Sequence, residues 1–213
     1  LLGVNGAGKT TLSSILASIS PLTAGSISMN GVSIYEDIAT YRRMVGFCPQ
    51  KINMDNDLSI EQNLLYAGKY MGINDTIAQA KTQEFMGIYG LTKYRNQRPD
   101  VLSGGYARRL LIARALMHEP KLVILDEPAV GLDPHVRHQL WEMIRNLKNH
   151  GVSVVLTTHY IDEAEFLSDR IVVLDKGKVR LIDTPQGLKT VYDKSRLEDV
   201  FIQLVQEDAQ VAS

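Results

Sequence analysis

The chain has little cysteine, no dominant charge and no long apolar run, and each shortage excludes a class of protein. A single cysteine, Cys48, in 213 residues excludes an internal disulfide framework and fits a reducing compartment. The 23 basic residues nearly balance the 24 acidic ones, so no general positive field indicates nucleic acid as a partner. The apolar runs at 122–125 and 152–156 are far too short to span a bilayer. Any anion binding must therefore be local.

The composition itself is that of a globular protein. Hydrophobic residues make up 45% of the chain and charged residues 22%, which suits one sizeable domain with a proper core. Leu1 and Leu2 run straight into a glycine-rich loop, with no initiator methionine and no room for a preceding strand. We interpret the sequence as a fragment that lacks its true N-terminus.

Strand-like apolar runs alternate with helical periodicity, which predicts an α/β fold with a mostly parallel sheet. Between about 57 and 100 the strands stop, and Ser59 with Gln62 forms a capping box at the start of a helix. We expect a catalytic core at 1–50 and 101–182, an all-helical subdomain at 51–100 and a C-terminal extension at 183–213. The predicted strands are 122–125, 152–156, 171–174 and 179–182, the last entered by a hairpin turn at 175–178; the predicted helices follow the glycine loop and cover 76–89, 104–118 and the stretch that Asp133 caps.

The strongest motif is GVNGAGKT, residues 3–10, which matches the eight-position phosphate-binding loop. Glycines let backbone N–H groups curl around phosphate oxygens, and the helix that follows adds its positive end. Lys9 can reach the outer phosphates, and the Thr10 hydroxyl can bind Mg²⁺. An ordinary glycine turn is the alternative, but the lysine and two threonines at the required offsets favour a nucleotide. The predicted nucleotide-binding residues of the loop are Asn5, Gly6, Ala7, Gly8, Lys9, Thr10 and Thr11.

A second motif, LVILDEP, delivers two acids to the carboxyl end of a buried strand, where open α/β sheets bind ligands. Asp126 would hold Mg²⁺, and Glu127 would orient and deprotonate the attacking water as a general base. A solvated acidic strand end is the alternative, which a phosphate loop in the same chain makes minor. The pair of acids therefore indicates hydrolysis rather than binding alone.

Two further polar residues are weaker candidates. His159 ends another predicted strand, where a neutral imidazole could bond to the γ-phosphate or to the water. Gln50 lies where the core gives way to the helical insert, so its amide oxygen could touch the metal. Taken alone, a structural histidine and a surface glutamine would be ordinary. The other histidines lie in or beside helices and are expected to be solvated: His118, His135, His138 and His150.

The residues Ser103, Gly104 and Gly105 pose a question, because they form a second anion cradle at a helix N-terminus. No lysine or metal ligand accompanies them. As an isolated feature, such a segment is more often a capping turn.

Together these motifs resemble the ATP-binding cassette (ABC) ATPases, a family of P-loop NTPases with a RecA-like core. The phosphate loop, Gln50, LSGGY, LVILDE, GLDP and TTH come in the family's order and spacing over nearly the whole chain. Tyr106 stands where many members have glutamine, and Val4 replaces a common proline. The aromatic residue that stacks on adenine and the N-terminal antiparallel edge of the fold would lie upstream of Leu1.

The resemblance answers the question about the second cradle. In this family two cassettes pack head to tail, so Ser103, Gly104 and Gly105 would close over ATP held by the phosphate loop of a second, identical subunit. Asp133 in GLDP resembles an acid that lines this interface. The helical insert resembles the surface that grips a membrane-embedded permease. The implied cofactors are ATP and Mg²⁺, and the implied location is the cytoplasmic face of a membrane.

The segments AVGLDP, TTHYIDEAEFLSDR and RLEDVFIQLV resemble the ATPases of type-2 exporters. An importer ATPase is the alternative within transport. A soluble ATPase of translation or DNA repair is a further alternative, although neither a second phosphate loop nor sustained heptads are present. A nucleotide-gated module that hydrolyses poorly is disfavoured by Glu127.

Overall fold

The computed structural model describes residues 1–211, which form two compact units. The terminal unit combines residues 1–10 with the chain from 157 onward, and the central unit spans residues 11–156. Helix α1 (Lys9–Leu16) begins in the terminal unit and continues into the central one. The expected division into a catalytic core, a helical subdomain and a C-terminal extension stays a prediction.

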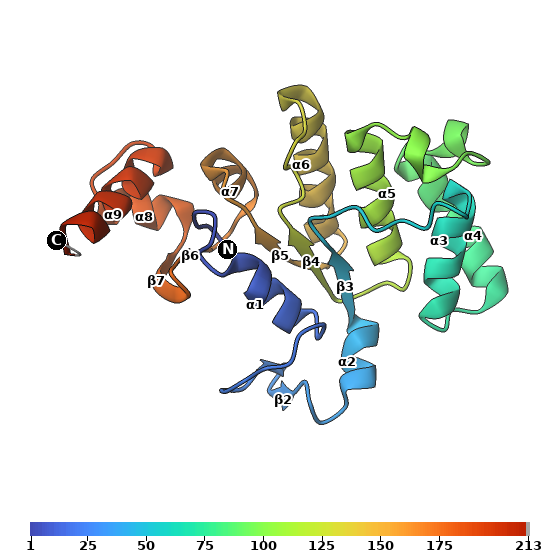
Figure 1. Ribbon diagram of the computed structural model, residues 1–213, viewed down its shortest axis with the longest axis horizontal. Coiled ribbons are helices and arrows are strands. Elements are labelled where there is room, and N and C mark those ends of the chain that lie inside the picture. The colour runs from blue at the N-terminus through green and yellow to red at the C-terminus, as the bar shows by residue number, and fades with distance from the viewer. Residues whose placement is uncertain (212–213) are drawn as a thin grey trace. The chain divides into compact units, whose positions relative to one another are not determined.

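The terminal unit is built around strand β6 (Ile171–Asp175), which pairs antiparallel with β7 (Lys178–Asp183) (Figure 1). The turn at Lys176 and Gly177 has φ values of +46° and +75°, as a two-residue hairpin turn requires. Leu2 bridges in parallel to both Thr158 and Val173, so the first residues extend this sheet. Three helices complete the unit: α7 (Ile161–Leu167), α8 (Pro185–Val191) and α9 (Leu197–Val211). Its core contains Leu2, Ala164, Ile171, Val173, Leu188, Leu197, Val200 and Leu204.

The central unit contains a three-stranded sheet in the order β3 (Val45–Cys48), β4 (Leu122–Asp126), β5 (Ser153–Thr157), of which only Thr157 is assigned to the terminal unit. Strands β3 and β4 are parallel, with Val45 opposite Leu122. Helices α2 (Ile38–Met44), α5 (Gly104–Leu116) and α6 (Pro134–Asn149) belong to the same unit, with a short antiparallel hairpin of β1 (Ser28–Met29) and β2 (Val32–Ser33). Val123, Ile124 and Leu125 of β4 are fully buried, so β4 is the core strand.

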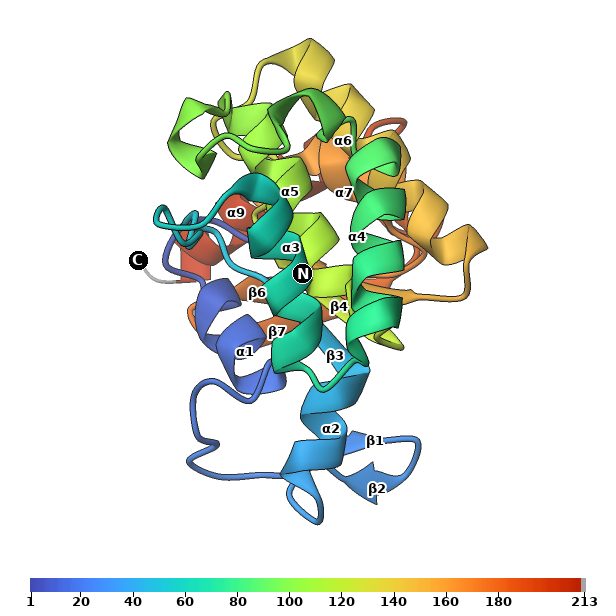
Figure 2. The same ribbon diagram turned by 90° about the vertical axis from the view of Figure 1, so that its right-hand side faces the viewer.

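The helical insert of the central unit consists of α3 (Ile60–Tyr70), α4 (Asp75–Ile88) and two short 3₁₀ turns (Thr92–Tyr94 and Pro99–Val101). The capping box is confirmed: Ser59 Oγ accepts from the Gln62 N–H at 3.1 Å, and Gln62 Oε1 accepts from the Ser59 N–H at 2.8 Å. Helices α3 and α4 lie side by side, with α3 also packed against α5 (Figures 1 and 2). Ile60 and Leu64, both fully buried, anchor α3 in this packing.

Several helix ends differ from the sequence-based prediction. Helix α5 ends at Leu116 rather than at His118, because Glu119 with φ +54° and the following Pro120 cannot continue it. Asp133 lies at the N-cap position of α6, but its side chain accepts no capping hydrogen bond, so Pro134 at the first helical position marks the start instead. Within residues 1–211, none of the helices combines the length and the apolar composition needed to cross a bilayer.

Candidate functional site

The phosphate-loop sequence forms a tight turn in the terminal unit. Gly6 and Gly8 have φ values of +84° and +101°, which side chains with a Cβ rarely adopt. A Cβ added to Gly3 would lie only 2.4 Å from the carbonyl oxygen of Leu174 on β6. The glycines therefore serve both the turn and its close approach to the sheet.

Lys9, the first residue of α1, folds back over its own loop. Only 4% of this side chain is exposed, and its Nζ donates to the carbonyl oxygens of Gly3 at 2.9 Å and Val4 at 3.1 Å. The ammonium group thus lies inside the curl of the loop, beside the N-terminus of a helix. Thr10 and Thr11 are exposed on the first turn of that helix, and Asn5 and Gly6 are exposed on the loop.

The two predicted acids end β4 in the central unit. Asp126 is 1% exposed and Glu127 is 6% exposed, so both carboxylates are withdrawn from water. The backbone of Glu127 has a φ of +47°, a left-handed conformation that costs free energy for any residue with a Cβ. Backbone strain of this kind is found at many functional sites.

The structure brings Gln50 and Glu127 together although 77 positions separate them. Gln50 Nε2 donates to Glu127 Oε2 at 3.0 Å. A carboxylate only accepts, so this contact fixes the orientation of the amide and turns its Oε1 away from Glu127. Gln50, a weaker candidate for a metal ligand, therefore holds Glu127, the candidate general base.

The second cradle lies at the N-terminus of α5. Ser103 is the N-cap residue, yet its hydroxyl makes no capping hydrogen bond, and Ser103 and Gly104 are both exposed. Gly105 is buried, and a Cβ there would lie 2.5 Å from Val136 Cγ1 on α6. The hydroxyl and the helix N-terminus are therefore accessible from outside the central unit.

The other predicted residues divide between the two units. His159 follows β5, and its ring lies 4.3 Å from the ring centroid of Tyr160. Like Lys9, it belongs to the terminal unit, whereas Asp133 is exposed in the central unit. The terminal unit thus holds Asn5, Gly6, Ala7, Gly8, Lys9, Thr10 and His159; the central unit holds Thr11, Gln50, Ser103, Gly104, Gly105, Asp126, Glu127 and Asp133.

The expectation that His118 is solvated is wrong. Its side chain is half-buried, and Nε2 donates to the carbonyl oxygen of Val45 at 3.0 Å. Desolvation lowers the pKa of this imidazole below its usual value, which favours the neutral ring. Its position beyond α5, beside the buried strand β3, is tertiary information that helix periodicity did not supply.

The sequence analysis also missed Arg108, which is 5% exposed. Its guanidinium donates to the carbonyl oxygens of Pro49 at 2.9 Å and Gln50 at 3.0 Å. A signal was present: Arg108 lies four positions before Ile112, on the buried face of α5. A charge on an apolar helix face implies a polar partner inside the fold.

The donor set fits Mg²⁺. Hard cations of this kind bind carboxylate, hydroxyl and amide oxygens together with phosphates and water. In the central unit Asp126 supplies a buried carboxylate and Gln50 the Oε1 that does not bond to Glu127, and in the terminal unit Thr10 has an exposed hydroxyl. Among residues 1–211 no group of three or more His, Cys, Asp and Glu side chains could hold a metal.

Comparison with known proteins places these features in a family. The family model described as ABC transporter matches residues 1–130. The Nod factor export ATP-binding protein I of Mesorhizobium japonicum is 40% identical over 188 residues, 88% of this chain and 55% of its own length. The linearmycin resistance ATP-binding protein LnrL of Bacillus subtilis is 38% identical over 88% of this chain and 60% of its own length. The chain thus spans between half and two thirds of these relatives.

Solved structures agree with the sequence comparison. An ATP-binding subunit of an ABC transporter superposes with a TM-score of 0.84 at 28% identity, over 96% of this chain and 86% of the other. A dimeric ATP-binding cassette in a post-hydrolysis state, bound to ADP and Pi, superposes with a TM-score of 0.77 at 25% identity, over 86% of this chain and 83% of the other.

Proposed function

The chain belongs to the ABC transporter family, and from that premise we propose that it binds ATP with Mg²⁺ and hydrolyses the nucleotide to drive export through a separate membrane permease. The observation that carries this proposal is Glu127: a buried carboxylate on a left-handed backbone at the end of β4, held by Gln50, in a chain that also has a phosphate loop. Binding alone would not require that acid.

Phosphate binding is assigned to the loop at 3–10. Lys9 would exchange the carbonyl oxygens of Gly3 and Val4 for the β- and γ-phosphate oxygens. Backbone N–H groups of the loop and of the first turn of α1 would donate to the same anion. Thr10, Gln50 and Asp126 would hold Mg²⁺, which when bound neutralises phosphate charge and assists departure of the leaving group. The loop is already curled, so little ordering is needed on binding.

Hydrolysis is assigned to Glu127 with help from Gln50 and His159. Glu127 would accept a proton from the water that attacks the γ-phosphorus, and burial strengthens its electrostatic interaction with that water. Gln50 keeps the carboxylate in place through its amide N–H. His159 would bond to the γ-phosphate or the water as a neutral imidazole.

A second copy of the subunit completes the site in this proposal. The exposed Ser103 hydroxyl and the N-terminus of α5 would close over the γ-phosphate held by the partner, and Asp133 would line the interface. The dimeric cassette with ADP and Pi supports such pairing, since its fold matches this chain. ATP would favour the closed dimer and hydrolysis would release it.

The permease, the direction of transport and the cytoplasmic face of a membrane are proposed from the exporter relatives. The helical insert, α3 and α4, is the surface we assign to the permease, because it stands out from the strand core beside α5.

Replacing Glu127 with Gln tests the proposal. This change keeps the shape of the side chain and removes the base, so turnover should fall by about 10² to 10⁴ while ATP binding stays intact. The measurement is the steady-state ATPase rate of the full-length protein together with a direct ATP binding assay. The control is Glu36→Gln, an exposed residue before α2 and outside the helical insert, which should leave both unchanged. Unchanged turnover in the Glu127 variant would remove this residue from the role of general base.

A further inference from the structure

Three side chains on α5 and just beyond its C-terminal end hold β3 and the segment that follows it. Arg108, Arg114 and His118 donate to backbone carbonyl oxygens along 45–53: His118 to Val45, Arg108 to Pro49 and Gln50, and Arg114 to Asn53 at 3.0 Å. These donors lie six and four positions apart and follow the helix and its C-terminal end. We name residues 49–53 the Gln50 loop. The loop is thus bound to α5 through its backbone.

Helix α5 packs so closely against β3 that the two elements cannot slide freely past each other. A Cβ added to Gly46 on β3 would lie 2.2 Å from the carbonyl oxygen of Ala115 on α5. Strand and helix are therefore in direct backbone contact just before the Gln50 loop begins. A rigid support of this kind lets a side chain on α5 determine the position of the loop.

Arg108 makes two of the four hydrogen bonds that Arg108, Arg114 and His118 donate to residues 45–53. Its guanidinium is planar and rigid, and two of its nitrogens bond to two consecutive carbonyl oxygens of the loop. The side chain is 5% exposed, so these bonds are shielded from competing water. A buried charge is retained only where partners compensate it, and here the partners are the backbone of the Gln50 loop.

The attachment continues to the proposed catalytic carboxylate. Arg108 fixes the backbone of Gln50 at 3.0 Å, and the side chain of the same glutamine donates to Glu127 at 3.0 Å. Only one residue therefore stands between the guanidinium and the general base. Displacement of the Gln50 backbone would move the amide that orients Glu127.

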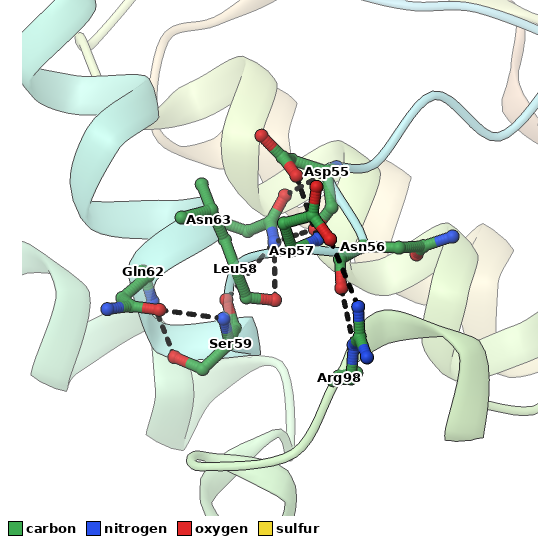
Figure 3. A network of polar contacts seen from close by, with 8 residues as sticks. All are labelled: Asp55, Asn56, Asp57, Leu58, Ser59, Gln62, Asn63 and Arg98. Carbon is green, nitrogen blue, oxygen red and sulfur yellow. Dashed lines mark hydrogen bonds and ion pairs between the residues drawn. The ribbon is translucent and has the colours of Figure 1, made fainter.

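The far side of the loop is held by different elements. Asn63 on α3 bonds to the backbone of Asp55 at 2.9 Å and 3.1 Å, and Arg98 bonds to the carbonyl oxygen of Asn56 at 2.6 Å (Figure 3). These contacts tie Asp55 and Asn56 to the helical insert. Lys51 and Ile52, which lie between the carbonyl groups bound by Arg108 and by Arg114, are exposed. The backbone of Gln50 is therefore held by α5 rather than by the helical insert.

We infer that Arg108 is a positioning residue for hydrolysis, because it fixes the Gln50 backbone to the helix that carries Ser103, Gly104 and Gly105. The inference rests on the proposed ATPase function. Arg108 thereby connects the exposed N-terminus of α5 to the carboxylate of Glu127. The connection runs through the first turns of α5, the Arg108 guanidinium and the side-chain amide of Gln50. A shift of α5 on closing over the partner's nucleotide is then transmitted to the general base.

The replacement Arg108→Lys tests the inference in the full-length protein. Lysine keeps the charge and most of the stem but lacks the planar fork, so kcat should fall about 10-fold to 100-fold while KM for ATP stays within about threefold. The control Arg145→Lys makes the same change on the exposed side of α6 and should have no effect. An unaltered kcat, or a loss confined to KM, would overturn the inference.

Combining the change with Gln50→Ala separates positioning from general damage. If Arg108 acts through Gln50, adding Arg108→Lys to the Gln50→Ala variant should cost less than about twofold in kcat. A full additional loss would mean that Arg108 acts by another route and would overturn the inference.

NMR relaxation gives a readout that needs no activity. Backbone amide order parameters of 50–53 should fall in Arg108→Lys, while those of β4 stay as in the unaltered protein. Unchanged order parameters in the Gln50 loop, or loosening spread over the whole central unit, would contradict the attachment by Arg108. An unaltered protein that hydrolyses no ATP would refute the proposed function, and the relaxation result would still decide whether Arg108 holds the loop.

Discussion

Two helix N-termini in this chain carry glycines and could each hold an anion, but they are built differently. The loop at 3–10 curls around a buried Lys9 whose Nζ already bonds to two carbonyl oxygens, and Gly3 presses against Leu174. The segment 103–105 has an exposed serine hydroxyl with no capping bond. Residues 3–10 therefore form a closed anion site that contains its own cation, whereas residues 103–105 form an exposed helix N-terminus.

The difference teaches what each can do alone. A phosphate loses much solvation on binding, and a lysine with a ring of N–H groups compensates that loss. A helix N-terminus and one hydroxyl compensate much less, because the helix dipole contributes only about 0.3–1 kcal/mol at an exposed site. We therefore expect 3–10 to bind nucleotide unaided, and 103–105 to act only on nucleotide that is already held elsewhere.

Removing the ammonium group of Lys9 should have the largest effect on ATP binding and turnover. A small effect would contradict the difference drawn between the two segments. Lys9→Ala should weaken ATP binding and lower turnover by about 10² or more, since the lysine contacts the charge that develops in the transition state. Ser103→Ala should leave binding to single subunits within about threefold and lower turnover by about 10-fold. The measurements are ATP binding and ATPase rate at matched protein concentration. Equal loss of binding in both variants would contradict the distinction.

Adding one methyl group to each cradle sharpens the comparison on the stability side. Gly3→Ala places a Cβ 2.4 Å from a backbone oxygen and should lower the free energy of unfolding by about 1–3 kcal/mol. Gly104→Ala meets only Leu132 Cδ2 at 3.5 Å and should change the same free energy by less than about 0.5 kcal/mol. Urea unfolding of the two full-length variants measures both. Equal destabilisation would show that the second cradle is as tightly packed as the first.

Much of the fold followed from local signals. The capping box of Ser59 and Gln62, the hairpin turn at Lys176 and Gly177 and the buried strand β4 were all predictable, because each depends on neighbouring residues only. The α/β class and the family were likewise correct. The division of the chain into domains and the roles of the site residues stay predictions.

What the sequence could not supply was the contact between distant positions. The bond from Gln50 to Glu127 joins two elements 77 positions apart, and the fork of Arg108 reaches back 58 and 59 positions. The left-handed backbone of Glu127 depends on how β4 ends in the folded sheet. His118 was misjudged for the same reason, since its partner Val45 lies on another element.

The central claim is a composite site made by two copies, and mixing two inactive variants tests it most directly. Full-length Lys9→Ala and Ser103→Arg proteins, each inactive alone, are allowed to exchange subunits, and ATPase activity is followed. A hybrid dimer keeps one intact site, so activity should return to roughly a quarter of the unaltered level if exchange is random. No recovery at any ratio, with exchange verified, would contradict the account.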